Sequence, residues 1–187
     1  MRLINRRVPV TEAQPQKSKK GIYHISDPFL RFWFRYVHPN HSSLALGLAD
    51  GVLEQRIKPT FDNFVGFAFE DLARDYMARL ARAGKLPFLP DRIESWWERD
   101  VEIDVAAVND REKVMLAGEC KWSIHPVGVS VLNALKKKTD RLTLAGEWKI
   151  TSYILFSRSG FTNELVNRAG SEDLLLISAP DLLDKGL

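Results

Sequence analysis

The stretch that decides the fold is VMLAGECKW, residues 114–122. Alternate side chains of a β-strand lie on opposite faces, so Glu119 and Lys121 would project together from an otherwise apolar strand. Burying such charges is costly unless they are paired or bound to a metal, and a purely structural strand has no need of them. We therefore interpret this stretch as part of a functional site.

A second apolar run, residues 101–108, contains Asp104 near its middle. The residues that follow, Asn109-Asp110, are typical of a turn, so the two runs predict a β-hairpin that brings Asp104 back toward Glu119. We expect strict alternation along this first strand. One face would then carry Asp104 with Glu102, Ala106 and Val108, and the other would carry Val101, Ile103, Val105 and Ala107.

Two carboxylates held close together repel each other and raise one pKa unless a cation lies between them. Oxygen ligands suit Mg²⁺ or Mn²⁺, which can bind a phosphate oxygen and acidify a water molecule. Lys121 could orient that water or neutralise charge that develops on phosphorus. The pair Asp104 and Glu119 is therefore the candidate metal site.

A further carboxylate lies on a helix that we expect to begin at Pro59-Thr60 and to end at Gly84. At 3.6 residues per turn, Glu70 is the only charge on a stripe of small and apolar residues, and Asp71 and Arg74 fall on another stripe. That position is compatible with a side chain that reaches toward the metal.

The expected elements follow the order αβββαβ around a mixed sheet, which is an α+β arrangement. They are the helix that carries Glu70, strands near 92–97, 101–108 and 114–122, a helix near 127–144 and a strand near 151–156. Over residues 60–157 this order, together with Asp104 and Glu119-Cys120-Lys121, resembles the PD-(D/E)XK nuclease superfamily, whose fold is that of restriction endonucleases.

The resemblance implies a metal-dependent DNA endonuclease that hydrolyses phosphodiester bonds. It would make Asp104 and Glu119 the ligands of Mg²⁺ or Mn²⁺, Lys121 the catalytic lysine, and Glu70 an additional carboxylate at the metal. In the alternative interpretation, Asp104 and Lys121 form a partly buried ion pair. The domain would then bind DNA or another protein without catalysis.

The flanking residues 3–10, 17–23 and 27–37 resemble the region that follows the ATPase module in archaeal-type DEXX-box P-loop ATPases. That resemblance implies an N-terminal P-loop ATPase domain as a partner and a winged-helix remnant before the nuclease-like part. The chain itself contains no Gly-x-x-x-x-Gly-Lys-Ser/Thr motif, so the ATPase domain would lie outside it. We expect a basic hairpin and helical linker over residues 1–56 and a nuclease-like domain over residues 57–187.

Positive charge is concentrated at the N-terminus. The first 20 residues hold six basic residues against one acidic residue, or +5, so a net charge of +3 for all 187 residues leaves −2 for the remainder. We expect a hairpin whose tip presents Lys17, Lys19 and Lys20 to the DNA backbone, as a wing would. A solvated tail is the alternative.

Further basic residues lie on the helix that follows Lys121 and could bind phosphates near the site: Lys136, Lys137, Lys138 and Arg141. The alternative, which we favour, is a solvated helix face.

Asp27 and Pro28 predict the start of a helix whose residues 29–37 are almost entirely apolar. We expect an interior core helix, with a contact to another domain or a homodimer interface as the alternatives.

No apolar stretch reaches the length of a membrane span, and the single cysteine, Cys120, excludes an intrachain disulfide. These features favour a cytoplasmic location.

Overall fold

The computed structural model describes residues 3–144 and 148–183. Its centre is a mixed five-stranded sheet in the order β3-β4-β5-β6-β7. The first three strands pair antiparallel, and β5, β6 and β7 pair in parallel. The strands are β3 (Arg92–Glu98), β4 (Val101–Asn109), β5 (Val114–Lys121), β6 (Lys149–Ser157) and β7 (Leu174–Ser178).

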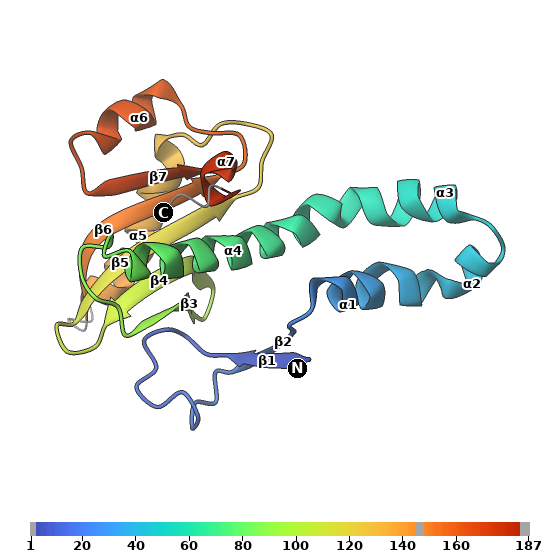
Figure 1. Cartoon of the computed structure of the whole chain (residues 1–187), viewed down its shortest axis with the longest axis horizontal. Coiled ribbons are helices and arrows are strands. Elements are labelled where there is room, and N and C mark those ends of the chain that lie inside the picture. The colour runs from blue at the N-terminus through green and yellow to red at the C-terminus, as the bar shows by residue number, and fades with distance from the viewer. Residues whose placement is uncertain (1–2, 145–147, 184–187) are drawn as a thin grey trace.

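Helices cover both faces of the sheet (Figure 1). One face packs against α4 (Lys58–Arg82) and α7 (Ala179–Leu183), and the other packs against α5 (Val129–Leu144) and α6 (Asn163–Ala169). From α4 to β6 the chain follows the order αβββαβ, which confirms the expected α+β fold with a mixed sheet.

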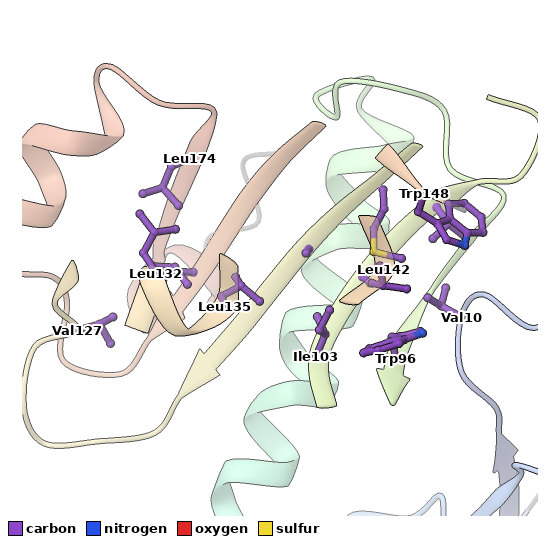
Figure 2. Close-up of a cluster of buried hydrophobic side chains, with 14 of the residues drawn as sticks. Val10, Trp96, Ile103, Val127, Leu132, Leu135, Leu142, Trp148 and Leu174 are labelled. Carbon is purple, nitrogen blue, oxygen red and sulfur yellow. The ribbon is translucent and has the colours of Figure 1, made fainter. Parts of the chain in front are cut away.

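The central strand β5 alternates as its sequence predicts. Met115 and Ala117 belong to the core under α5, whereas Leu116 and Cys120 belong to the core under α4. Both faces are therefore buried, as expected for a strand between two helical layers. Figure 2 shows the core under α5, where Leu132 and Leu135 lie over the sheet.

Strict alternation in β4 is wrong. Ile103 packs with Ala106 and Val108 under α5, whereas Val105 packs under α4. The cause is a β-bulge, because Glu94 pairs with Ala106 but Trp96 pairs with Ile103. One residue of β3 thus lies opposite two residues of β4, Asp104 and Val105, and the strand bends at Asp104.

At the N-terminus, β1 (Ile4–Arg7) and β2 (Ile22–Ile25) form the expected antiparallel hairpin. Its long loop lies on the edge of the main sheet, because Val10 is 2% exposed and its amide donates to the carbonyl of Ser95 at 2.9 Å. Figure 2 shows Val10 beside Trp96. The relation of this hairpin to a winged helix stays a prediction.

Between the hairpin and the sheet, the chain forms a helical arm that extends away from the core (Figure 1). Its outward half consists of short helical segments: α1 (Pro28–Phe32), η1 (Trp33–Val37), η2 (His38–Asn40) and α2 (His41–Ala45). Its return half runs through α3 (Ala49–Val52) and η3 (Leu53–Ile57) into α4 without a break. The predicted boundary between residues 56 and 57 falls inside this run and stays a prediction.

The helix ends follow local sequence. The Asp27 carboxylate caps α1 by accepting from the amide of Leu30 at 2.9 Å, as predicted. Gly84, which follows α4, has a φ of +66°, a conformation that glycine adopts without a steric penalty.

The prediction of an interior core helix over residues 29–37 is wrong. Tyr36 is 3% exposed, but Phe29 and Phe34 are 66% and 52% exposed. Only one side of the segment packs, where the rings of Phe32 and Tyr36 meet Phe64 of α4. Its other side leaves aromatic rings in solvent.

Within the two described ranges, no helix combines the length and the apolar character that a membrane crossing requires.

Candidate functional site

The bulge places Asp104 where β4 and β5 separate. The last residue pair between these strands is Val105 with Gly118, so the amide of Cys120 has no partner on the β4 backbone. The Asp104 carboxylate takes that place, because its Oδ2 accepts from the Cys120 amide at 2.8 Å. The acid is thus fixed beside Glu119 in the gap between two strands.

Arg74 of α4 binds both strands at the bulge. Its side chain is 8% exposed, and its guanidinium donates to the Ser95 hydroxyl and to the Asp104 carbonyl, both at 2.9 Å. It also donates to Asp71 at 2.6 Å. The sequence analysis placed Arg74 on another stripe of the helix from the site, and that placement is wrong.

Three arginines bind the Asp71 carboxylate. Its carboxylate accepts from Arg74, from Arg31 at 2.7 Å and from Arg7 of β1. Burial opposes its ionisation, but the hydrogen bonds from these guanidinium groups outweigh burial and lower the pKa of Asp71 to about 2. This cluster ties the hairpin, the arm and α4 together.

Glu70 lies next to this cluster, with its Oε2 3.8 Å from Arg74. Burial and the charge of Asp104 raise the pKa of Glu70 to about 8. Burial and the charge of Glu119 likewise raise the pKa of Asp104 to about 6. The predicted helix and strand carboxylates are therefore close enough to repel each other.

Glu119 is almost fully buried and meets two lysines. Its Oε1 accepts from Lys121 at 2.7 Å, and both of its oxygens accept from Lys138 of α5, at 2.9 and 2.6 Å. Burial disfavours the charge on Lys121, but the hydrogen bond from its ammonium to Glu119 and the charge of Glu119 outweigh burial and raise the pKa of Lys121. Lys121 therefore stays a cation at neutral pH.

The donor set fits Mg²⁺ or Mn²⁺ in its chemistry, because Asp104 and Glu119 supply carboxylate oxygens. At Asp104, burial and the charge of Glu119 outweigh the Cys120 hydrogen bond and the lysine charges, so a bound cation would favour the ionised carboxylate. Within the described ranges, however, no group of three or more His, Cys, Asp or Glu side chains is arranged to hold a metal ion. The structure thus does not assemble Glu70, Asp104 and Glu119 into a single three-ligand cluster. Glu119 is instead neutralised by Lys121 and Lys138.

Five of the lysines predicted to bind DNA lie in different surroundings. Lys17 and Lys19 are exposed on the hairpin loop, and Lys20 forms an ion pair with Glu12 at 2.8 Å. On α5, Lys137 is exposed, whereas Lys136 pairs with Glu172 at 2.5 Å. Their role in binding nucleic acid stays a prediction.

Two contacts of the candidate site were not predicted from the sequence, that of Lys138 with Glu119 and that of Arg74 with Asp104. Lys138 follows Lys136 and Lys137 in an uninterrupted basic run, and no local signal separates the lysine that reaches Glu119 from its neighbours. Arg74 carried a usable signal, since it lies four residues after Glu70 and occupies the same side of a helix.

The fold and this set of charges define an α+β domain in which two helices and two adjacent strands bring carboxylates and lysines together. The chain belongs to the DUF234 family, described as archaeal and bacterial proteins of unknown function, whose sequence model matches residues 33–141.

Two known proteins are similar to parts of the chain. An uncharacterised protein of Methanocaldococcus jannaschii, MJECL04, is 42% identical over 119 residues, which are 64% of this chain and 26% of that protein. The chain therefore spans about a quarter of this relative's length. Among solved structures, the DNA modification-dependent restriction endonuclease AspBHI matches 62% of this chain and 33% of its own, with 17% identity and a TM-score of 0.34.

Proposed function

We propose that this chain is a metal-dependent DNA endonuclease module that hydrolyses phosphodiester bonds. The observation that carries the proposal is the Asp104 carboxylate, which lies in the gap between β4 and β5 beside the Glu119 and Lys121 pair. The β-bulge that directs Asp104 into this gap disrupts the hydrogen-bond ladder between β3 and β4. Bulges are frequent next to active sites.

In the proposed site, Asp104 and Glu119 hold Mg²⁺ or Mn²⁺, and Glu70 acts through the metal or its water. The bound cation would polarise a phosphoryl oxygen and acidify a water molecule. Lys121 is a cation with a raised pKa, so it supports charge stabilisation at the phosphoryl group rather than proton abstraction. Its side chain is 40% exposed and can therefore reach a substrate.

A second function is favoured by the contacts of Glu119. Lys138 binds both oxygens of that carboxylate, so the charge is compensated without a metal. A domain with such a site would bind DNA or another protein without cleavage.

The proposed partners are DNA and an N-terminal P-loop ATPase domain, with a homodimer as a further option. The ATPase partner is supported by the resemblance of residues 3–37 to chains that carry such a domain.

Cleavage of plasmid and branched DNA in Mg²⁺ or Mn²⁺ tests the proposal. We expect Asp104→Ala and Lys121→Ala each to lower the rate by on the order of a hundredfold, because each removes charge aimed at the transition state. The matched control is Lys149→Ala, since Lys149 is exposed at the opposite end of the parallel β5–β6 pair and should have no effect.

Lys121→Ala should keep the metal, whereas Asp104→Ala should lose it. No cleavage by the native chain in either metal, together with no stabilisation by Mn²⁺, would establish the non-catalytic function. Cleavage that survives both substitutions would identify a contaminating nuclease.

A further inference from the structure

A cleft of about 700 Å³ lies between the N-terminal hairpin, the helical arm, α4 and the turn between β3 and β4. We call it the aromatic cleft, because rings from the hairpin, the arm, α4 and β3 line it. They are Tyr23, Phe34, Phe64, Phe67 and Trp97. Its volume lies within the range of about 300 to 1,000 Å³ that is usual for small-molecule and cofactor sites.

Three of these rings face solvent to an unusual degree. Tyr23 is 69% exposed, Phe67 is 56% exposed and Phe34 is 52% exposed. They come from β2, α4 and η1 and meet at one cleft, so they form a patch rather than scattered surface residues. Exposed rings in such a patch can stack on a flat ligand.

Arginines line the same cleft. Arg7 and Arg31 are held by Asp71, whereas Arg35 and Arg99 are exposed at the rim. Guanidinium groups bind phosphates through paired donors and also stack on planar rings. The cleft thus combines stacking surfaces with cations.

Three acidic residues also line the cleft: Glu70, Asp100 and Glu102. The Asp100 carboxylate pairs with Arg141, which is outside the lining, at 3.1 Å. The four arginines of the lining therefore outnumber its acidic residues by one.

Glu70 connects the aromatic cleft with the candidate metal site. It lines the cleft, and its carboxyl group is close enough to Asp104 for the charge of Asp104 to raise its pKa. A ligand that enters the cleft therefore approaches the carboxylates that the proposed cleavage uses.

We propose that the aromatic cleft binds unpaired nucleotides of a DNA strand, and that the substrate of this chain is DNA with a single-stranded segment. The inference rests on the proposed nuclease function. In the interior of a duplex both faces of every base are covered by neighbouring bases, so along a strand only unpaired bases can present their faces to Phe34 and Phe67. Aromatic rings that stack on bases, combined with cations that follow the backbone, are the usual means of binding single strands.

A protein segment fits the aromatic cleft less well. It would have to remove Arg35, Arg99 and Glu102 from water and supply a partner for each charge. A single strand matches the arginines with its phosphates and the rings with its bases.

The test is the fluorescence anisotropy of labelled oligo(dT), compared with a blunt duplex hairpin of the same length. It is performed in EDTA so that binding is separate from cleavage. We expect tighter binding of oligo(dT) than of the duplex. Phe34→Ala and Phe67→Ala should each weaken oligo(dT) binding roughly five- to hundredfold, because each removes one stacking surface.

The matched control is Phe29→Ala. Phe29 is 66% exposed on the same arm but does not line the aromatic cleft, so its removal should leave binding unchanged. All three rings are exposed, and circular dichroism should show that the variants keep the fold.

Equal binding of oligo(dT) and duplex, or equal affinities of the Phe34, Phe67 and Phe29 variants, would overturn the inference. A native dimer that Phe34→Ala or Phe67→Ala converts to a monomer, with no oligo(dT) binding, would overturn it in favour of a protein interface. Selective oligo(dT) binding without cleavage in Mn²⁺ would refute the nuclease function and leave the binding site standing.

Discussion

The Oδ2 atom of Asp104 accepts a hydrogen bond from the backbone amide of Cys120 at 2.8 Å, beyond the last ladder pair between β4 and β5. In this contact a side-chain oxygen takes the place of the backbone carbonyl that a paired strand would supply. It satisfies a buried amide that would otherwise lack a partner, and it holds a carboxylate beside Glu119 although burial and that neighbouring charge raise the pKa of Asp104 to about 6. The hydrogen bond to Cys120 therefore favours the Asp104 carboxylate at this position, whereas burial and the charge of Glu119 disfavour its ionisation.

Substitutions of Asp104 should separate these two effects. Asp104→Asn retains an oxygen that can accept from the Cys120 amide and removes the repulsion from Glu119, so its free energy of unfolding at neutral pH should equal or exceed that of the native chain. Asp104→Ala leaves the amide unsatisfied and should cost about 1 to 3 kcal/mol. Urea unfolding measures both. Equal stabilities of the two variants would show that the hydrogen bond to Cys120 is of no consequence.

Lys138 competes with a metal for Glu119. Its ammonium binds both carboxylate oxygens, so a cation that coordinates Glu119 must displace it. Lys138→Ala should therefore strengthen Mn²⁺ binding roughly five- to thirtyfold, which corresponds to about 1 to 2 kcal/mol for a partly buried ion pair. Isothermal titration calorimetry is the measurement.

Lys137→Ala is the control for this experiment, because Lys137 is the exposed neighbour of Lys138 on α5. An unchanged or weaker affinity in Lys138→Ala would mean that Glu119 is not a metal ligand.

Gly118 is required where β4 and β5 last pair. A Cβ atom at this position would lie 2.7 Å from the Cγ2 atom of Ile154 and 3.1 Å from the Val105 carbonyl oxygen. Gly118→Ala should therefore destabilise the fold by about 1 to 3 kcal/mol through overpacking. Thermal unfolding of the variant measures the loss.

Gly66 provides the opposite case within α4, because a Cβ atom there would meet nothing within 4 Å. Gly66→Ala should stabilise the chain by about 0.5 to 1 kcal/mol, since alanine loses less conformational entropy in a helix. The same sign of change for both substitutions would contradict this account.

Much of the fold could be predicted from local sequence. The alternation in β5, the turn after Asn109 and the end of α4 near Gly84 are set by neighbours in the chain, and the structure confirms all three. The β4 bulge could not be predicted in this way. At the bulge the two strands are joined by Arg74, thirty residues before Asp104, whose guanidinium donates to the Ser95 hydroxyl and to the Asp104 carbonyl.

The residues of the candidate site likewise divide into those that local sequence predicts and one that depends on tertiary packing. Asp104, Glu119 and Lys121 carry a sequence motif, and alternation along one strand is sufficient to place Glu119 and Lys121 on one face. Lys138 reaches Glu119 only because α5 packs over β5, a tertiary contact without a local signature. The prediction that residues 29–37 form an interior helix was wrong for a related reason. An apolar helix sequence does not specify whether the same chain or another molecule covers it.

Glu70 should make the stability of the chain depend on pH. Its pKa is raised from the ordinary 4.5 to about 8, so between these values the folded chain binds a proton that the unfolded chain has released. Stability from this group is present at low pH and is lost as the pH rises through about 8. We expect the free energy of unfolding to fall by about 1 kcal/mol between pH 7 and pH 8.

Glu70→Gln removes the titrating proton and should flatten this slope. Asp104, with a pKa of about 6, and His24, whose pKa is lowered below its ordinary 6.5, titrate mainly below this interval. Burial also raises the pKa of Glu94 and of Cys120, and both residues remain in Glu70→Gln, so the difference between the two slopes belongs to Glu70. Urea unfolding at several pH values, performed in EDTA, measures the slope. An equal slope in the native chain and in Glu70→Gln would place the titrating group elsewhere, and Glu70 would then be ionised beside Asp104 at neutral pH.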